Sequence, residues 1–256
     1  KYAVFNCLAK TLATAFWPGP LTLVVPRHQQ CKISILASAG LDTVALRVPA
    51  NTTARRLIKV ANIPIAAPSA NLSGRLSPTH AQHVINQLGT EISLILDGGP
   101  CSVGLESTVI DVSNEKPVLL RLGGLPNEAI EQVIGQKLLL HTGDSGKIKS
   151  PGLLLNHYAP LLALRINAKA PRPGEVFLGF GKNANNANLN LSPTGDLLEA
   201  AANLFAYLQR LDTMPAKGIA VMPIPNKSIG LAINDRLMRA AVQSDKKSCR
   251  DKEDIN

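Results

Sequence analysis

Short apolar runs bounded by Gly or Pro alternate with stretches of helical spacing along this chain, and this alternation limits its fold to the α/β class. In the first half, the runs predict strands over Leu21–Pro26, Thr43–Val48, Ile63–Ala67, Leu94–Asp97, Thr108–Val112 and Val118–Arg121. The residue spacing predicts helices over Thr52–Ala61, Thr79–Leu88 and Asn127–Ile134. The second helix has Ser77 as its expected N-cap and Pro78 at its first position. We therefore expect a twisted open sheet flanked by helices.

A second series of the same kind follows residue 160. It predicts strands and helices over Leu162–Asn167, Val176–Gly179, Asp196–Leu211, Gly218–Met222 and Ala232–Val242. Gly, Pro and Lys are frequent between the two series, which is typical of an exposed linker. We predict a first α/β domain over residues 1–140, a linker over 141–160, a smaller Rossmann-like α/β domain over 161–243 and a disordered tail over 244–256.

The start of the chain also bears on the first domain. Lys1 stands where an initiator Met is usual, and Leu8–Phe16 already has the pattern of the end of a helix. We therefore expect the first sheet to be incomplete at its N-terminal side.

Composition narrows the classes of protein that this chain can belong to. The net charge is +9 without a dense basic block, which favours anions such as nucleotides, phosphates or RNA but equally fits a solubilising surface without a partner. The four Cys residues form no C-x-x-C pair, so neither a zinc site nor a disulfide framework is predicted. Every apolar run is far shorter than the ~20 residues of a membrane span. We expect a soluble cytoplasmic protein without a membrane segment.

Polar residues follow several of the predicted strands. Ile65–Gly74 places Ser and Asn after a run of small residues, where a ligand can approach the backbone, although an ordinary polar turn has the same composition. Asp97–Gly104 is a glycine-dense loop that suits a phosphate or a tight turn. Thr43 and Arg47 face one side of a strand and could hold a carboxylate or a phosphate, but exposed strand Arg is common. Arg121 is either a ligand or a member of a surface ion pair.

The order of these motifs closely resembles the Sua5/YciO/YrdC family, of the Sua5 type. The blocks that carry the resemblance are Phe16–Val25, Val44–Pro49, Pro64–Gly74, Asp97–Gly99, Glu106–Asp111, Arg121–Gly123, Ser150–Gly152, His157–Pro160 and Gly230–Ala241. They extend over nearly the whole chain to about residue 243, so the resemblance implies a YrdC-like first domain and a Sua5-type second domain.

The resemblance implies the synthesis of threonylcarbamoyl-AMP from L-threonine, bicarbonate and ATP, with release of pyrophosphate. ATP would bring Mg²⁺, and the product would pass to the machinery that makes the t6A modification in tRNAs reading A-starting codons. Nucleotidyl transfer mainly requires that reactants be positioned and phosphate charge neutralised, so no nucleophilic side chain is needed. The family also implies possible binding of double-stranded RNA.

The resemblance implies site residues by their position in the motifs. Those expected at ATP are Thr43, Ser69, Asn71, Ser77, Arg121, His157 and Tyr158. Those expected at L-threonine are Arg47, Ala67 and Ser107. His157 and Tyr158 belong to a linker expected to close over the site, and no residue is expected to bind a metal directly.

The chain departs from the family pattern in two respects. It contains neither the P-T-E-T-V-Y-G-L-G strand nor the K-x-R motif, so we expect this chain alone to be inactive or nearly so. In the linker, Leu153 and Leu155 replace a Met and a Tyr of the family pattern. The alternative is a non-catalytic remnant that binds RNA. A third option, the carbamoyl-transfer domain of hydrogenase maturation, would be expected with zinc-finger Cys pairs that are missing here.

Overall fold

The structure is a computed structural model that describes residues 1–140 and 158–253, with side chains through residue 242. The chain forms two compact units, and each contains two separate stretches of sequence. The first unit comprises Lys1–Pro68 and Glu106–Leu153, and the second comprises Ser69–Leu105 and Leu154–Asn256. The sequence had suggested a single boundary near residues 141–160, whereas here residues 69–105 join the C-terminal half.

The first unit is built on a mixed sheet. Its elements are α1 (Cys7–Phe16), β1 (Leu21–Pro26), the 3-10 helix η1 (Ile35–Ser38), β2 (Thr43–Leu46), α2 (Thr52–Ala61), β3 (Thr108–Asp111), β4 (Val118–Arg121), α4 (Asn127–Ile134) and β5 (Leu139–Leu140). Among the described residues the strand order is β2-β1-β3-β4-β5. β1 runs antiparallel to β2 and parallel to β3, while β4 is antiparallel to β3 and parallel to β5.

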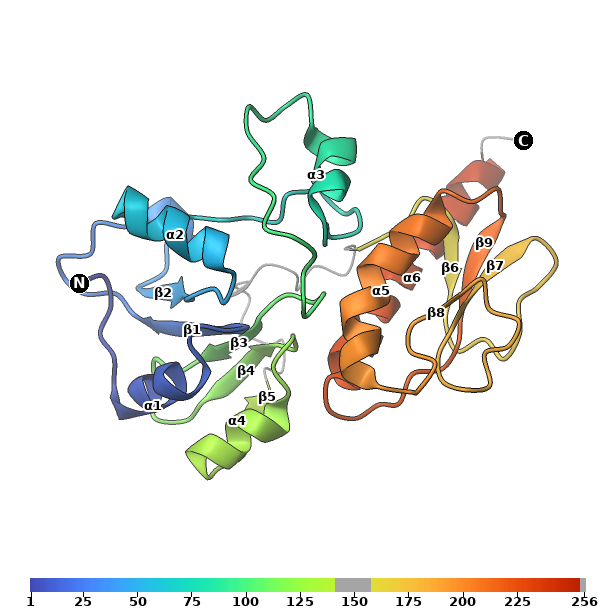
Figure 1. Cartoon of the computed structure of the whole chain (residues 1–256). Helices are drawn as coiled ribbons and strands as arrows, with labels where there is room; N and C mark the ends of the chain where they lie inside the picture. Colours follow the sequence, from blue (N-terminus) through green and yellow to red (C-terminus); the bar gives the residue numbers. More distant parts are fainter. Residues whose placement is uncertain (141–157, 254–256) are drawn as a thin grey trace. The chain divides into compact units, whose positions relative to one another are not determined.

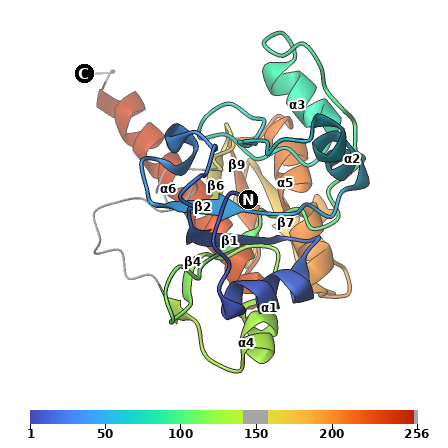
Figure 2. The same ribbon diagram turned by 90° about the vertical axis from the view of Figure 1, so that its left-hand side faces the viewer.

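Helices α1 and α4 cover one face of this sheet (Figure 1, Figure 2). Ala9 and Leu12 of α1 and Ile130 of α4 are buried in one cluster with side chains of β1, β3 and β4. Asn6 begins α1, because its side chain accepts a hydrogen bond from the backbone N–H of Ala9 at 2.8 Å. This packed layer holds the strands whose ends form the candidate site.

The second unit is built on a parallel sheet. Its elements are α3 (Ala81–Leu88), β6 (Ala163–Arg165), β7 (Glu175–Gly179), β8 (Leu189–Asn190), α5 (Leu197–Asp212), β9 (Gly218–Val221) and α6 (Gly230–Glu253). Among the described residues the strand order is β6-β9-β7-β8, and every pair is parallel. Helices α5 and α6 lie on one face of the sheet (Figure 1), where residues such as Leu204, Leu208 and Ile233 form the core.

The predicted α/β class is confirmed, with a twisted mixed sheet and a second, parallel sheet. Two predicted strands are wrong, because Ile63–Ala67 and Leu94–Asp97 form no ladder with another strand among the described residues. A strand needs a hydrogen-bonded neighbour, and side chains of both runs are instead exposed. β5 and β8 were missed, since two residues carry no readable period.

Two helix ends differ from the sequence prediction. α3 begins after His80, and the expected cap Ser77 is buried before it in a segment without regular structure. α6 continues to Glu253, although a disordered tail was expected from residue 244. Residues 243–253 contain neither Gly nor Pro, so nothing in that stretch ends the helix. No helix in the described part of the chain has the length and apolarity needed to span a bilayer.

Candidate functional site

One end of the first sheet collects polar side chains from its strands. β1 and β3 begin there in parallel, with Leu21 opposite Thr108, and β4 ends there, with Arg121 opposite Val109. β2 runs toward the same end, because Leu46 pairs with Leu23. The strands therefore bring Thr22 and the residues just outside β2 and β3, which are Arg47 and Ser107, to one edge of the sheet.

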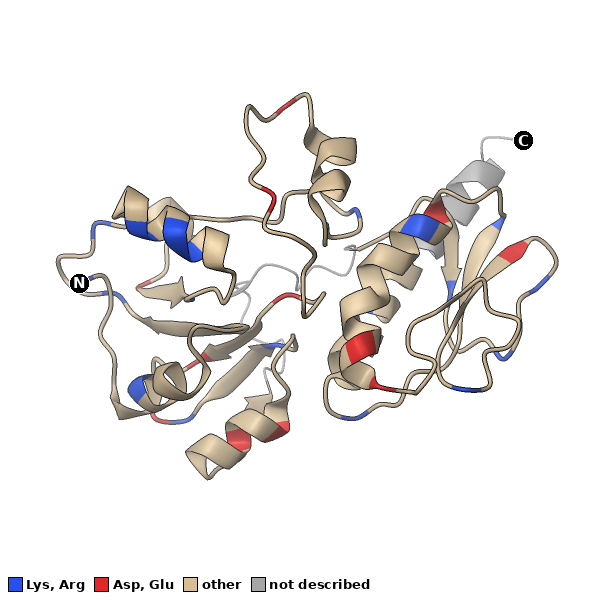
Figure 3. Ribbon diagram, viewed as in Figure 1, with Lys and Arg blue, Asp and Glu red and all other residues tan. Residues whose placement is uncertain are grey.

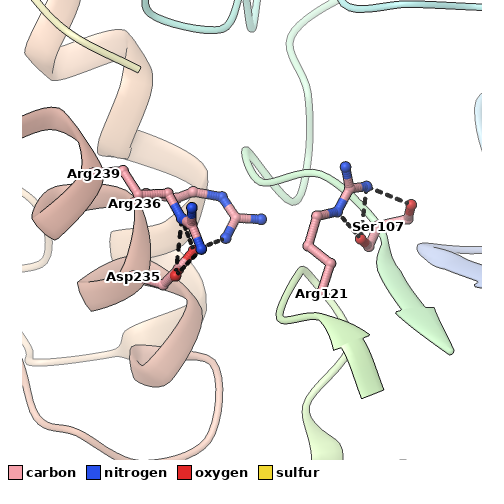
Figure 4. Close-up of polar contacts among 5 residues, drawn as sticks. All are labelled: Ser107, Arg121, Asp235, Arg236 and Arg239. Atoms are coloured by element: carbon pink, nitrogen blue, oxygen red, sulfur yellow. Dashed lines mark hydrogen bonds and ion pairs between the residues drawn. The ribbon is translucent and has the colours of Figure 1, made fainter. Parts of the chain in front are cut away.

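At this edge, Arg121 binds Ser107. The Arg121 guanidinium donates to the Ser107 carbonyl oxygen through Nε at 3.1 Å and Nη2 at 2.9 Å, and Nη2 lies 3.1 Å from Ser107 Oγ (Figure 4). Ser107 is 3% exposed. Its hydroxyl also lies 2.7 Å from the hydroxyl of Thr22. Two hydroxyls and one cation thus form a continuous hydrogen-bonded set, whose chemistry suits a carboxylate or a phosphate.

Gly123 explains how β4 and the residues before β3 come so close. A Cβ at this position would lie 2.4 Å from the carbonyl carbon of Ser107 and 2.4 Å from the nitrogen of Thr108, both of which are backbone atoms. The next residue, Gly124, donates its N–H to the Glu106 carbonyl at 2.8 Å. Gly123 is therefore required by the close approach of two backbones, which holds Arg121 over Ser107.

Arg47 is fixed to the turn that precedes β1. Its Nε donates to the Gly19 carbonyl at 3.0 Å, and the Gly19 N–H donates to the Val48 carbonyl at 2.9 Å. Trp17 closes the same turn, because its indole N–H donates to the Leu21 carbonyl at 2.7 Å. The turn thus places a second guanidinium at the end of the sheet that holds Ser107.

Of the other two ligand residues expected in the first unit, Thr43 lies apart from this edge and Ala67 lies outside the sheet. Thr43 pairs with Pro26 at the other end of β2, so it lies ~13 Å along the strand from Arg47. Ala67 lies in an exposed segment without regular structure. The first unit by itself therefore brings together Arg47, Ser107 and Arg121.

In the second unit, Asn71 closes a turn with its own side chain. Its Nδ2 donates to the carbonyl of Leu72 at 2.8 Å and to that of Arg75 at 3.3 Å. Its Oδ1 is buried and has no hydrogen-bond partner among the described residues. A buried acceptor without a donor is uncommon in folded proteins, so Asn71 retains the capacity to accept one hydrogen bond. Ser69 lies beside it and is exposed, whereas Ser77 is buried.

Tyr158 is buried in the second unit. It adopts the left-handed backbone conformation, with φ of 68°. Its ring lies 5.3 Å from the guanidinium carbon of Arg236 and 5.3 Å from the ring centre of Phe205. Arg236 is 1% exposed, and its Nη1 forms an ion pair with Asp235 Oδ2 at 2.5 Å (Figure 4). The same oxygen accepts a hydrogen bond from Arg239 Nε. His157 lies outside the described residues.

Two residues of these clusters were not expected from the sequence. Thr22 lies in a strand, where threonine is common, so its sequence position does not indicate a polar contact. In the structure its hydroxyl forms a hydrogen bond with the hydroxyl of Ser107. Arg236 lies between the apolar residues Ile233 and Leu237, and a cation on the inner face of a helix is the signal that could have identified it.

The hydroxyl and guanidinium groups of Thr22, Ser107 and Arg121 suit an anion better than a bare cation. No group of three or more His, Cys, Asp or Glu side chains that could hold a metal ion occurs within residues 1–140 and 158–242. Mg²⁺ keeps several waters and is commonly held by substrate phosphates with few protein ligands. The residues described here therefore fit Mg²⁺ only as a companion of a bound nucleotide. Lys and Arg positions are spread over both units rather than gathered at one place (Figure 3).

Two family models match this chain in sequence. The Sua5/YciO/YrdC model, which is described as telomere recombination, matches residues 1–123. The model of the threonylcarbamoyl-AMP synthase C-terminal domain matches residues 125–242.

Curated relatives and a solved structure agree with these matches. The threonylcarbamoyl-AMP synthase of Pyrococcus abyssi is 40% identical over 91% of this chain and 73% of its own length. That of Bacillus subtilis is 39% identical over 91% of this chain and 72% of its own length. The crystal structure of P. abyssi Sua5 complexed with L-threonine superposes with a TM-score of 0.82, at 38% identity, over 95% of this chain and 76% of that one. This chain therefore belongs to the Sua5/YciO/YrdC family, as a transferase of the threonylcarbamoyl-AMP synthase type.

Proposed function

We propose that this protein makes threonylcarbamoyl-AMP from L-threonine, bicarbonate and ATP. The threonine amino group and bicarbonate give a carbamate with loss of water. A carbamate oxygen then bonds to the α-phosphorus of ATP as the bond to pyrophosphate breaks. The names of the relatives support this reaction, and so does the L-threonine bound to the P. abyssi protein.

The hydrogen-bonded set of Thr22, Ser107 and Arg121 is the observation that carries the proposal. The reaction joins two anions, a carbamate and a nucleotide, so the protein must neutralise charge and hold both in line. A guanidinium beside two hydroxyls at the end of a sheet provides that environment without a nucleophilic side chain. Excluding water would protect the carbamate and the mixed anhydride from hydrolysis.

We assign the ligand contacts from the family motifs. ATP, accompanied by Mg²⁺, would contact residues Thr43, Ser69, Asn71, Ser77, Arg121, His157 and Tyr158. L-Threonine would contact Arg47, Ala67 and Ser107. The buried, unpartnered Oδ1 of Asn71 supports a role for that residue, because a bound ligand could supply the donor that it needs.

We propose that the product is consumed in the cytoplasm by the machinery that forms t6A in tRNAs reading A-starting codons. The mixed anhydride of threonylcarbamate and AMP is an activated acyl donor, so the consuming step must be an acyl transfer to a nucleophilic amine.

The test is release of pyrophosphate from ATP that depends on both L-threonine and bicarbonate. It should be measured for this chain and for the chain preceded by the family's N-terminal segment, and we expect the extended protein to turn over. Arg121→Lys should lower its rate about 100-fold, because a lysine cannot reproduce the forked guanidinium contact. Lys137→Gln is the matched control, since Lys137 pairs with Glu131 on an exposed surface. Pyrophosphate release without a need for threonine would overturn the proposal.

RNA binding is a second candidate function, favoured by one feature. Helix α2 has no buried residue and carries Arg55, Arg56 and Lys59. An exposed basic helix attracts a phosphate backbone. Binding of double-stranded RNA should weaken steeply with salt, and charge reversal of Arg55 and Arg56 to Glu should abolish it without changing pyrophosphate release. An RNA affinity that does not change with salt concentration, or that persists after charge reversal, would exclude this role for α2.

A further inference from the structure

Residues 69–105 precede the C-terminal half in sequence but share its core. Leu76 is 3% exposed and belongs to the same buried cluster as Leu204, Phe205 and Leu208 of α5. Burial of a leucine side chain contributes about 2 kcal/mol relative to exposure. The segment that holds Ser69, Asn71 and Ser77 is therefore anchored on α5.

The far end of this segment also lies against α5. A Cβ on Gly104 would lie 2.2 Å from the Ala201 carbonyl oxygen and 2.6 Å from the Ala202 Cα, so the backbones are in direct contact. Gly104 has a φ of 72°, a conformation that favours glycine. Leu105 packs against the same core cluster. Both ends of the segment are thus attached to one helix.

One side chain of α5 contacts Ser77, a residue predicted to bind ATP. Gln209, in the last turn of α5, donates from Nε2 to the backbone carbonyl of Ser77 at 2.9 Å. Ser77 is 7% exposed. A buried carbonyl needs a partner, so this hydrogen bond fixes the backbone from which the Ser77 side chain projects.

A backbone bridge between Arg75 and Ala159 holds the other side of the turn. Ala159 donates its N–H to the Gly74 carbonyl at 2.8 Å and forms a parallel bridge with Arg75. Gln209 and Ala159 therefore hold the backbone of residues 74–77 at two points. Nearby, Gln87 donates from Nε2 to the Leu76 carbonyl at 3.3 Å, so Gln209 is the contact that acts on the Ser77 carbonyl itself.

We propose that Gln209 is a positioning residue for nucleotide binding, acting through the Ser77 backbone. The C-terminal unit then contributes to ATP affinity through a residue that itself contacts no substrate. This inference rests on the proposed function, because Ser77 is an ATP residue only under that proposal.

The test compares three variants of the whole chain. Gln209→Met keeps the length of the side chain and removes the donor, whereas Gln209→Lys keeps an N–H donor. Gln82→Met is the matched control, because the Gln82 amide donates to Asn86 Oδ1 on the exposed face of α3. Each protein is examined by amide hydrogen exchange over residues 69–80 and by calorimetric titration with ATP and Mg²⁺.

We expect Gln209→Met to speed exchange over residues 69–80 and to raise the Kd for ATP about five- to tenfold, the loss of roughly one hydrogen bond. Gln209→Lys should restore both, and Gln82→Met should change neither. In the extended protein that turns over, Gln209→Met should raise KM for ATP and leave kcat and KM for threonine unchanged.

The possible outcomes distinguish the role of Gln209 in ATP binding from the proposed function of the protein. Faster exchange with an unchanged ATP affinity would overturn the role of Gln209 in binding, and unchanged exchange would overturn its role as an anchor. An equal loss of kcat and of affinity for both substrates would indicate general damage and also contradict the inference. If the wild-type chain and its extended form bind no ATP, the proposed function fails, while hydrogen exchange still decides whether Gln209 holds Ser77.

Discussion

At the level of single residues, the hydroxyl of Ser107 has only one proton to give. Arg121 donates to Ser107 Oγ, and Thr22 shares a hydrogen with it at 2.7 Å. If Thr22 donates, the Ser107 proton remains available to a ligand carboxylate; if Thr22 accepts, Ser107 presents a lone pair instead. Thr22 therefore sets which kind of ligand atom Ser107 can bind.

Thr22→Val should expose this role, because valine has the same shape and no hydroxyl. We expect KM for L-threonine in the extended, active protein to rise up to about tenfold, with Thr22→Ser restoring it. KM values from pyrophosphate release measure the effect. Thr11→Val is the control, since the Thr11 hydroxyl donates to the Cys7 carbonyl on the exposed face of α1. Equal behaviour of the Val and Ser variants would contradict the prediction.

His83 makes the stability of the second unit depend on pH. Burial, and then the neighbouring His80, lower the pKa of His83 below its usual value. Its neutral Nδ1 accepts the Thr79 N–H at 3.2 Å. In the unfolded chain His83 gains a proton as the pH falls through about 6.5, whereas the folded chain resists protonation until the lowered pKa. The contribution of His83 is therefore present above that range and is lost as the pH falls.

We expect the Tm of the second unit to fall as the pH is lowered from about 8 to about 5. His83→Asn should reduce this fall, because asparagine keeps an acceptor and does not titrate. Thermal unfolding followed by hydrogen exchange over residues 69–105 provides the measurement. His28→Asn, on an exposed turn of the first unit, serves as the comparison. A steeper pH dependence in His83→Asn than in the wild type would show that the sign is wrong.

At the level of elements, the sequence predicts those whose ends carry their own signals. Helix α2 begins after Asn51, whose side chain accepts from Ala54, and ends at Asn62 in the left-handed conformation, so its predicted bounds are confirmed. Ile63–Ala67 has a strand composition, but a strand also requires a neighbour that local composition does not encode. The start of α3 was wrong for a related reason, because Ser77 is engaged by Gln209 from a distant helix.

The sequence likewise predicts some residues of the candidate site and misses others. Ser107 and Arg121 were expected as ligand residues from the family motifs, and the structure joins them by hydrogen bonds; their roles at the ligands stay predictions. Thr22 was missed because its contact with Ser107 spans 85 residues of sequence. Pairings of that kind follow from the register of β1 and β3, which becomes known only with the fold.

The junction of β3 and β4 allows a test at this level. Gly123→Ala should lower the unfolding free energy of the first unit by at least about 1–3 kcal/mol, because the new Cβ meets backbone that cannot rotate away. Chemical denaturation measures this change. Gly135→Asn is the control: Gly135 has a φ of 68° and open space around it, and asparagine tolerates that conformation. Equal losses in both variants would show that the close approach at Gly123 is not the cause.

At the level of the whole molecule, each unit is assembled from two stretches of chain, and its core should decide which stretches unfold together. Leu204→Ala removes a fully buried side chain from the core of the second unit and should cost about 2–5 kcal/mol. Leu23→Ala makes the same change in the first. Hydrogen exchange in increasing denaturant should show residues 69–105 losing protection in Leu204→Ala, and residues 1–68 losing it in Leu23→Ala. Loss of protection over residues 69–105 in Leu23→Ala alone would contradict the division.

The attachment of residues 69–105 to α5 also determines when this chain can fold during synthesis. Ribosomes add about 5–20 residues per second, and roughly 100 residues separate Leu105 from Gln209. The segment therefore leaves the ribosome about 5–20 seconds before the helix that receives it. During that interval Leu76 has no core to enter and is available to chaperones and proteases. A pause in translation before α5 would prolong this exposure, so the yield of folded protein should depend on the speed of translation as well as on stability.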